Sequence, residues 1–295
     1  MFSDESPHLR VLPSMPVSTF EEAAQALKTL PAPWWLRSRT SGNQLCVELR
    51  EENELTLAWH KACALMPGVP VYVQPAVSGT CYRVLGAYDG RAFRPTHFLE
   101  ERMREGFYRI PNACVIPPHT QTGPRRRVLN AAAQMAGRWP GEPGPLCVEL
   151  IEDGTHTLAA QCNQDGVQGS LSDALRLFLG YTMQADRLDT EDGARSSTLE
   201  PGIAAAVCWF DAPTGVVVEI AGLTEARGME DVLEVVMGIH EGDTVRHVTD
   251  TASRDRLGYV VATGENAQAA LRTARRAVAA VRIETSPILE PAGED

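Results

Sequence analysis

The spacing of apolar and polar residues divides the first 75 residues into short helices and strands. Residues Ser18–Glu21 place a hydroxyl and a glutamate where they can satisfy each other's free backbone amides, which predicts a capped helix that runs to about Leu30. Asn53 predicts the start of a second helix that ends near Leu65 and carries its apolar residues on one face. Strands are predicted at residues 34–37, 45–49 and 69–74, and residues 1–15 are interpreted as a tail.

Two Asp-Gly pairs dominate the middle of the chain. Asp89-Gly90 lies between the strand-like runs 80–88 and 91–98, and Asp153-Gly154 lies between the runs 146–151 and 156–160. An Asp-Gly pair between two such runs is typical of a β-hairpin. Helices are predicted at residues 124–138 and 172–179, and the polar residues 186–198 are the best candidate for a linker.

The last third of the chain contains four strand-like runs followed by a helix. The runs cover residues 203–210, 216–221, 232–239 and 257–263, and Asn266 stands where an N-cap of the closing helix is expected. Hairpin signals separate the strands as often as helices do. The pattern therefore predicts an α+β protein and not a doubly wound parallel sheet.

Composition and charge restrict the classes of function. The 295 residues are 44% hydrophobic and 22% charged, which is typical of a globular protein. The formal net charge of -11 argues against a nucleic acid or an anionic membrane as a partner, and the basic clusters Arg125–Arg127 and Arg272, Arg275 and Arg276 are interpreted as solvated faces. The seven cysteines form no CxxC pair, the first residues lack the pattern of a signal peptide, and no apolar run has the length of a membrane span. The sequence therefore predicts a cytoplasmic protein with free thiols.

The order of elements also resembles a known family. Leu257–Gly264, followed by a helix, resembles the closing segment of amino-acid ligases, and Gly215–Gly222 and Glu241–Asp243 fit the hairpins before it. Over residues 16–285 the chain resembles the ATP-grasp superfamily, and most closely its carboxylate–amine ligases. The resemblance implies an ATP-grasp-like fold with two unequal α+β lobes, a cleft between them and a mostly antiparallel C-terminal subdomain.

The resemblance also implies domain boundaries. These are a tail at 1–15, a small ATP-grasp-like lobe at 16–75, a large ATP-grasp-like lobe at 76–190, a ligase-type subdomain at 191–285 and a tail at 286–295. Only about a dozen residues precede the first matched element. The family's usual preceding domain, a Rossmann-like unit that helps to form the substrate site, is therefore expected to be absent.

ATP-grasp ligases make an acyl phosphate from a carboxylate and ATP, and an amine then displaces the phosphate. Such chemistry needs cations on the phosphates and magnesium between them. The resemblance places the phosphate-binding lysine of the family at Arg37, the glycine-rich loop at Ser41–Gln44 and the adenosine hinge at Val71–Pro75, which contains Gln74. Arg37 keeps the charge but not the shape of lysine, a single glycine remains in the loop, and Gln74 stands where an acidic residue is usual.

The positions of the magnesium ligands depart further from the family. The resemblance places the two bridging carboxylates at Glu149 and Gln161, the asparagine ligand at Asn163 and a phosphate-binding arginine at Asp165. Glu149 and Asn163 match. Gln161 is neutral and Asp165 is an anion where a cation is expected. Because magnesium prefers anionic oxygen ligands, these changes predict a weakened, vestigial metal site at Glu149 and Asn163 and a vestigial ATP cleft at Arg37 and Gln74.

Two hypotheses follow. The first, which the charge at the metal site favours, is a non-catalytic ATP-grasp-like binding or accessory protein for a peptide, an amino-acid-like ligand or a partner enzyme. The second is a divergent ATP-dependent carboxylate–amine ligase, and ATP and magnesium are expected as cofactors only in that case. The resemblance also allows a homodimer. Fold analogy by itself is a weak basis for function, so the choice between the two hypotheses depends on the residues of the cleft.

Overall fold

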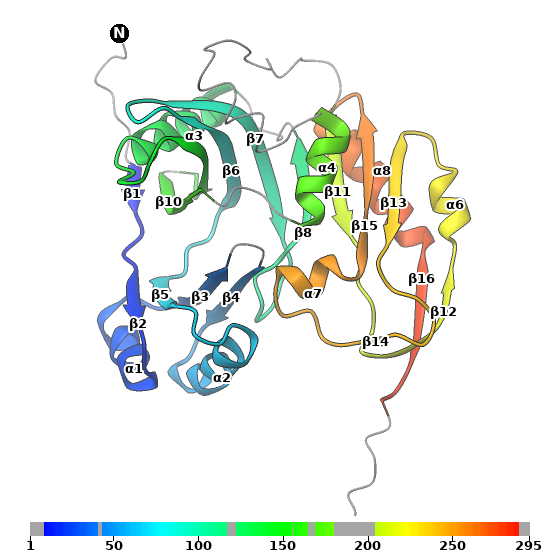
Figure 1. Ribbon diagram of the computed structural model, residues 1–295, viewed down its shortest axis with the longest axis horizontal. Coiled ribbons are helices and arrows are strands. Elements are labelled where there is room, and N and C mark those ends of the chain that lie inside the picture. Colours follow the sequence, from blue (N-terminus) through cyan, green and yellow to red (C-terminus); the bar gives the residue numbers. More distant parts are fainter. Residues whose placement is uncertain are drawn as a thin grey trace, which may run out of the picture.

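The computed structural model describes residues 9–40, 43–116, 122–154, 156–164, 169–179 and 204–288. Within these residues the strands form three sheets of four, nine and three strands, and helices pack on their faces (Figure 1). All strand pairs are antiparallel except for β1 and β10. The expected α+β class with two unequal lobes and a mostly antiparallel C-terminal part is confirmed.

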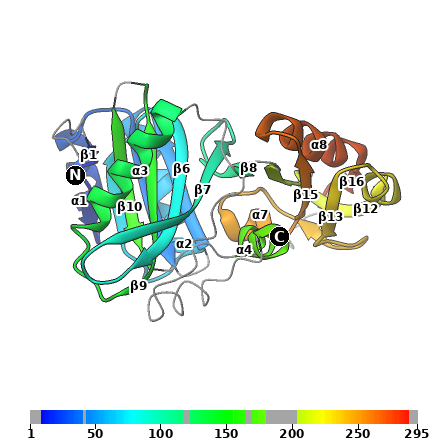
Figure 2. The ribbon, with the colours of Figure 1, turned by 90° about the horizontal axis from the view of Figure 1, so that it is seen from above.

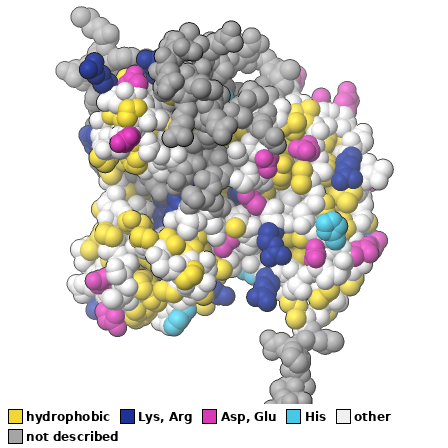
Figure 3. All heavy atoms as spheres, in the orientation of Figure 1, with side chains coloured by type: hydrophobic (Ala, Val, Ile, Leu, Met, Phe, Trp, Pro, Cys, Tyr) yellow, Lys and Arg dark blue, Asp and Glu magenta, His cyan; other side chains and the backbone are white. Residues whose placement is uncertain are grey.

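The small lobe is a four-stranded sheet with two helices on one face. The strand order is β2 (Met15–Val17), β5 (Val71–Pro75), β3 (Trp34–Thr40) and β4 (Asn43–Leu49). The helices are α1 (Phe20–Thr29) and α2 (Leu55–Leu65), and they pack on Leu36, Leu45 and Val73. On the face seen in Figure 3, hydrophobic side chains gather over this lobe at the lower left. Phe20 of α1 and Leu57 and Leu65 of α2 are exposed.

The nine-stranded sheet extends through the middle of the molecule and into its C-terminal part (Figures 1 and 2). In sheet order its strands are β1 (Leu9–Val11), β10 (Thr157–Asn163), β9 (Gly144–Glu152), β6 (Thr80–Tyr88), β7 (Phe93–Met103), β8 (Pro111–Ile116), β11 (Ala204–Trp209), β15 (Gly258–Gly264) and β13 (Val232–Met237). The pairing of β8 with β11 joins the part that carries the small lobe to the C-terminal part.

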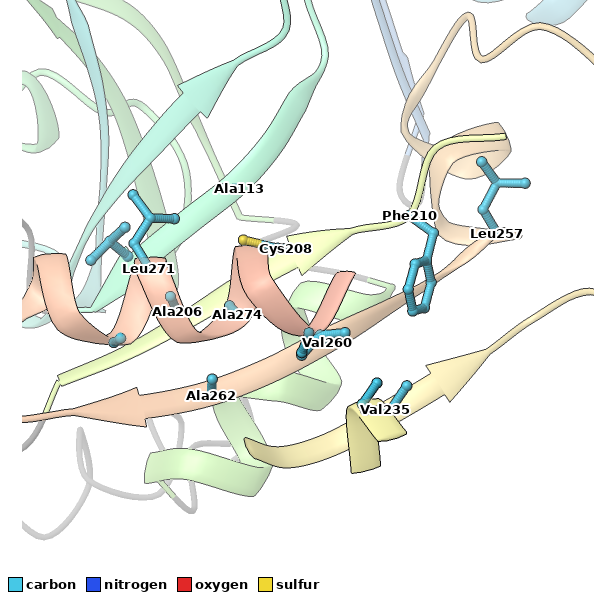
Figure 4. Packing of buried hydrophobic residues seen from close by; sticks show 14 of the residues in the cluster. Ala113, Ala206, Cys208, Phe210, Val235, Leu257, Val260, Ala262, Leu271 and Ala274 are labelled. Carbon is cyan, nitrogen blue, oxygen red and sulfur yellow. The ribbon is translucent and has the colours of Figure 1, made fainter. Parts of the chain in front are cut away.

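Helices cover the two faces of this sheet differently. On one face, α3 (Thr122–Ala136) packs on β9 and β10, and α8 (Ala267–Ala280) packs on β11 and β15. Figure 4 shows Ala206 and Cys208 of β11 beside Leu271 and Ala274 of α8. Strand side chains alternate between faces, so Val207 and Trp209 point the other way and pack with α4 (Ser170–Leu179). The small lobe lies on this second face.

The C-terminal part adds a small sheet and two short helices. The sheet has the order β14 (Thr244–Val245), β12 (Gly215–Ala221) and β16 (Arg282–Ser286), and the helices are α6 (Leu223–Arg227) and α7 (Thr251–Asp255). Gly222 joins β12 to α6 with φ 84°, and a Cβ atom there would lie 1.9 Å from the carbonyl oxygen of Ala280. Only glycine fits this close turn.

Several local predictions are confirmed and several need correction. Both Asp-Gly hairpins form, and Asn266 caps α8 by accepting from the Ala269 amide. The first capping box uses Thr19 and Glu22 instead of Ser18 and Glu21, because the helix starts one residue later.

The predicted start of the second helix, with Asn53 as its cap, was wrong. A 3-10 turn at Glu52–Glu54 precedes α2, and the carboxylates of Glu51 and Glu54 cap that turn while Asn53 does not. Residues 9–11 and 15–17 form β1 and β2 although most of them lie in the predicted tail, because their backbone pairs with β10 and β5. The strand β16 was missed, and the predicted linker at 186–198 lies outside the described residues. None of the described helices is long and apolar enough to span a membrane.

Candidate functional site

The residues that face the cleft come from the polar side of the small-lobe sheet. Along β3 the side chains alternate, so Trp34 and Leu36 are buried against the helices, while Arg37 and Arg39 point toward the nine-stranded sheet. Gln74 of β5 pairs with Trp35 in the register and lies on the same side as Arg37. Because side chains alternate along each strand, one face of this sheet forms the core of the lobe and the other face borders the cleft.

Glu149 of β9 is the centre of the site. Its Oε2 accepts from Arg37 Nη2 at 2.9 Å, and its Oε1 accepts from Arg39 Nη1 at 2.8 Å and lies 3.5 Å from Arg83 Nη1. The side chains of Glu149, Arg37 and Arg83 are each only 10% exposed. Both oxygens of the carboxylate therefore contact guanidinium groups, two from β3 and one from β6.

The charges around Glu149 decide its protonation state. Burial by itself would raise the pKa of this carboxyl, but the positive charges of Arg83, Arg37 and Arg39 outweigh burial and lower the pKa to about 2. Glu149 is therefore ionised at neutral pH and forms the anionic centre of a buried cluster of cations.

The other predicted residues join the same network. Arg37 Nη1 donates to Gln74 Oε1 at 3.3 Å, and Arg39 Nη2 donates to Asn163 Oδ1 at 3.2 Å. Gln74 and Asn163 are both buried. The structure thus brings together Arg37, Gln74, Glu149 and Asn163, the four residues that the sequence singled out, although their functional roles remain a prediction.

Two arginines of this network were missed by the sequence analysis. Arg39 lies two residues after Arg37, so the strand period already places it on the same face. Arg83 stands directly opposite Glu149 in the pairing of β6 with β9, and its Nε lies 2.7 Å from Glu101 Oε1. No motif marks Arg83, because only the register of the sheet places it beside Glu149.

Some predicted positions lie beyond what the structure describes. Gln161 pairs with Glu149 across β10 and β9, so the two residues are direct neighbours in the sheet, but the side chain of Gln161 is not described. Ser41 and Gly42 of the predicted glycine-rich loop and Asp165 lie outside the described residues.

The described residues do not fit a magnesium ion at this position. Among them, no group of three or more histidines, cysteines, aspartates or glutamates is placed to hold a metal. Magnesium takes oxygen ligands at near-octahedral positions, whereas the oxygens of Glu149 already accept from or contact cationic groups. A metal on Glu149 would lie next to three guanidinium groups, whose positive charges would repel it.

A pocket of about 330 Å³ opens next to this network. The segment between β1 and β2 forms one wall, the ligand-facing residues of β3 and β5 form another, and α3 and β10 close it. The lining residues include Leu12, Arg37, Arg39, Tyr72, Gln74 and Met135. The pocket therefore combines two arginines with apolar and aromatic side chains, an arrangement that suits a small anion with an apolar body.

The tip of the β3–β4 hairpin is attached to the C-terminal part. Asn43 Oδ1 accepts from the Ala252 amide at 3.0 Å and from Thr251 Oγ1 at 3.2 Å, and the Gln44 amide donates to Thr251 Oγ1 at 2.9 Å. Gln44 Oε1 also accepts from Arg83 at 3.4 Å. These bonds hold the position predicted for a phosphate-covering loop against the first turn of α7.

Replacing Asn43 with alanine is expected to loosen this attachment. The change leaves the Ala252 amide and the Thr251 hydroxyl without their acceptor, so amide hydrogen exchange in residues 43–49 should become about tenfold faster, as expected for the loss of one or two hydrogen bonds. Exchange can be followed by mass spectrometry. Asn53→Ala is the matched control, because Asn53 bonds only to the exposed Glu51 in the same lobe. Equal exchange in the two variants would show that the attachment does not hold the hairpin.

Comparisons with known proteins concern the fold and the C-terminal part of the chain. Residues 208–286 match the model of the L-amino acid ligase C-terminal domain 2. No curated protein matches the chain by sequence. Among solved structures, the fold is similar to L-amino acid ligase from Bacillus licheniformis, with a TM-score of 0.72 and 14% identity over 94% of this chain and 68% of that chain.

Two more distant likenesses share the fold. N5-carboxyaminoimidazole synthase from Aspergillus clavatus, in complex with ADP and 5-aminoimidazole ribonucleotide, has a TM-score of 0.61 and 10% identity over 92% of this chain and 69% of that chain. Biotin carboxylase from Campylobacter jejuni has a TM-score of 0.59 and 13% identity over 94% of this chain and 64% of that chain. The chain therefore has an ATP-grasp-like fold, and its residues 208–286 match the C-terminal domain 2 of L-amino acid ligases.

Proposed function

We propose that this chain is a non-catalytic ATP-grasp-like protein whose cleft binds a small anionic ligand without magnesium. The observation that carries the proposal is the contact of three arginines with Glu149. In a ligase the corresponding carboxylate has to be free for the metal, because the metal stabilises the charge on the transferring phosphoryl group. Here that carboxylate serves to hold cations.

The charge of the cluster favours an anion in the pocket. Within the part of the chain that the structure describes, Arg37, Arg39 and Arg83 contact Glu149 and Glu101, so three positive charges stand against two negative ones. Arg37 and Arg39 line the pocket, and an arginine that already holds a carboxylate has further N–H groups for a second oxygen.

The remaining walls of the pocket suggest the class of ligand. Leu12, Tyr72 and Met135 provide apolar contacts, and Tyr72 is 40% exposed, so its ring is available to a ligand. A carboxylate with a small side chain, as in an amino acid or a short peptide, fits both the arginines and these walls. The similarity to an L-amino acid ligase supports the same class by analogy.

The accessory role includes a partner protein or a second copy of the chain. The exposed apolar side chains Phe20, Leu57 and Leu65 lie on the outer helices of the small lobe, away from the cleft. Because such side chains favour burial, this outer surface is where we expect a partner enzyme or a homodimer contact. We place the protein in the cytoplasm, since free thiols persist in a reducing compartment.

A divergent ATP-dependent carboxylate–amine ligase is the second candidate. It is favoured by the meeting of Arg37, Glu149 and Asn163 at one point of the cleft, together with the matched C-terminal domain. Under this alternative the arginines would have to release Glu149 when nucleotide and magnesium enter.

Calorimetric titration of ATP with and without magnesium separates the two candidates. We expect magnesium to change the dissociation constant of ATP by less than about twofold, because Glu149 has no free oxygen for the ion. No phosphate should be released from ATP in the presence of a mixture of amino acids. A gain of tenfold or more with magnesium, together with amino-acid-dependent phosphate release that Glu149→Gln abolishes, would establish the divergent ligase.

The same method tests the anionic ligand directly. Amino acids and dipeptides are titrated, without nucleotide or metal, into the wild type and the variants Arg39→Met and Arg50→Met. Arg50→Met is the control, because the side chain of Arg50 is exposed and does not line the pocket. Arg39→Met is expected to weaken binding by about tenfold or more through loss of a charge-assisted hydrogen bond, while Arg50→Met leaves it unchanged. Equal affinities in both variants would count against the cleft as the binding site.

A further inference from the structure

A second pocket lies on the opposite face of the nine-stranded sheet from the cleft. It has a volume of about 230 Å³ and is formed by the last turns of α8, by the residues at the start of β8 and by those that follow β11. Its floor includes Ile110, Cys208, Phe210 and Val278. Figure 4 shows Cys208 on β11 beside α8, and Phe210 on the segment that follows this strand. This pocket shares no residue with the cleft described above.

Most charged side chains of this second pocket are already paired. Arg104 makes two bonds to Asp211, at 3.2 and 2.8 Å. Arg254 is buried, donates to Asp255 and to the Pro111 carbonyl, and lies 3.8 Å from the centre of the Trp209 ring. These contacts hold the side chains of Arg104 and Arg254 in place, and the carboxylates of Asp211 and Asp255 balance their positive charges.

Arg275 is the exception. Among the described residues it makes no hydrogen bond or ion pair, although it lines the pocket. Burial raises the pKa of the Cys208 thiol to about 12, and the positive charge of Arg275 opposes this rise, so the guanidinium lies close enough to Cys208 to affect it. Arg272 and Arg276 belong to the same basic run of α8, but they do not line the pocket.

We propose that this pocket binds a small organic acid with a compact apolar body. The apolar floor takes the body, and Arg275 at the rim receives the carboxylate. A guanidinium without a protein partner is a ready donor pair for such a group. The neutralised pair of Arg104 and Asp211 leaves no free negative charge in the wall to repel the acid. The volume suits a single ring with its carboxylate and excludes a nucleotide.

Binding can be followed at Trp209. Its indole N–H donates to Ser170 Oγ at 2.6 Å. Trp209 is among the lining residues, and Arg254, which also lines the pocket, stacks on its ring, so the indole nitrogen–proton resonance should shift when the pocket fills. The chain has five tryptophans, and Trp209→Phe identifies the resonance. Titration with benzoate is expected to shift the Trp209 resonance with a dissociation constant in the range of about 1 mM, without shifting Trp35 in the cleft.

The variants locate the site and its charge. Arg275→Gln should weaken benzoate binding by about tenfold or more, and Arg276→Gln, the same change on an exposed residue outside the pocket, by less than about twofold. Ala279→Phe, which fills the pocket from an exposed position, should abolish the shift while the melting temperature stays near that of the wild type. Arg39→Met in the cleft should have no effect.

The proposal is overturned by any of four results. These are no shift of Trp209 with benzoate up to about 20 mM, equal weakening by Arg275→Gln and Arg276→Gln, undiminished binding to a folded Ala279→Phe, or binding of benzyl alcohol as tightly as benzoate. Because the cleft and this pocket share no residue, each can fail without the other.

Discussion

Replacing Glu149 with glutamine is expected to lower the free energy of unfolding by about 3–5 kcal/mol. The change keeps the size of the side chain but removes the anion that Arg37, Arg39 and Arg83 share. The guanidinium groups of Arg37, Arg39 and Arg83 would then lose the carboxylate that they share. Breaking a buried ion pair from one side costs far more than the pair contributes, because the remaining charge stays buried without compensation.

Urea unfolding at neutral pH measures this effect, and Glu219→Gln is the matched control. Glu219 pairs with Arg282, but the two side chains are 48% and 62% exposed, so the control should lose no more than about 1 kcal/mol. Similar losses in both variants would show that the arginine cluster does not depend on Glu149.

The pH dependence of stability gives an independent measure of the same group. The pKa of Glu149 is lowered from 4.5 to about 2 in the folded state. A carboxyl with a lowered pKa contributes stability above its unfolded pKa, and this contribution is lost as the pH falls toward the folded pKa. The wild type should therefore lose roughly 3 kcal/mol more than Glu149→Gln between about pH 5 and pH 2. Parallel pH profiles of the two proteins would contradict the assignment.

The second large effect is expected for Arg83→Met. Arg83 connects Glu149 with Glu101, and the side chain of Glu101 is only 5% exposed. Methionine keeps most of the apolar stem, but it leaves Glu101 buried without the guanidinium that lies 2.7 Å away. We expect a loss of about 3–5 kcal/mol in the free energy of unfolding, measured by urea unfolding, while Glu149 keeps Arg37 and Arg39.

A double variant separates charge from packing. Adding Glu101→Leu to Arg83→Met removes the stranded carboxylate, and the stability should return to within about 1–2 kcal/mol of the wild type. Arg94→Met is the control, because Arg94 pairs with Asp89 at the surface and should cost no more than about 1 kcal/mol. If the double variant is less stable than Arg83→Met alone, the loss comes from packing and not from the unpaired charge.

The sequence by itself determined the elements of the fold and much of their order. Turn chemistry at Asp89-Gly90 and Asp153-Gly154 predicts the two hairpins, because these residues accept the tight turn wherever it occurs. The Asn266 cap likewise needs only its neighbours in the chain. Local sequence does not predict the short strands β1 and β16, because they form by pairing with the remote strands β10 and β12.

The candidate site divides in the same way. Arg37, Gln74, Glu149 and Asn163 were named from the resemblance to ATP-grasp ligases, and their functional roles stay a prediction. Their actual partners could not be predicted. Arg83 meets Glu149 because β6 and β9 pair in one particular register, and Arg39 reaches Asn163 because the small lobe packs on the nine-stranded sheet.

Only the tertiary structure determines which groups contact the carboxylate of Glu149. In the sequence it is a residue that matches a metal ligand, and its charge says nothing about which groups will surround it. In the folded chain, side chains from β3 and β6 bring three guanidinium groups to its two oxygens. Coulombic attraction depends on distances between atoms far apart in the chain, so a linear pattern can name the charges but only the packing of the lobes sets which of them meet.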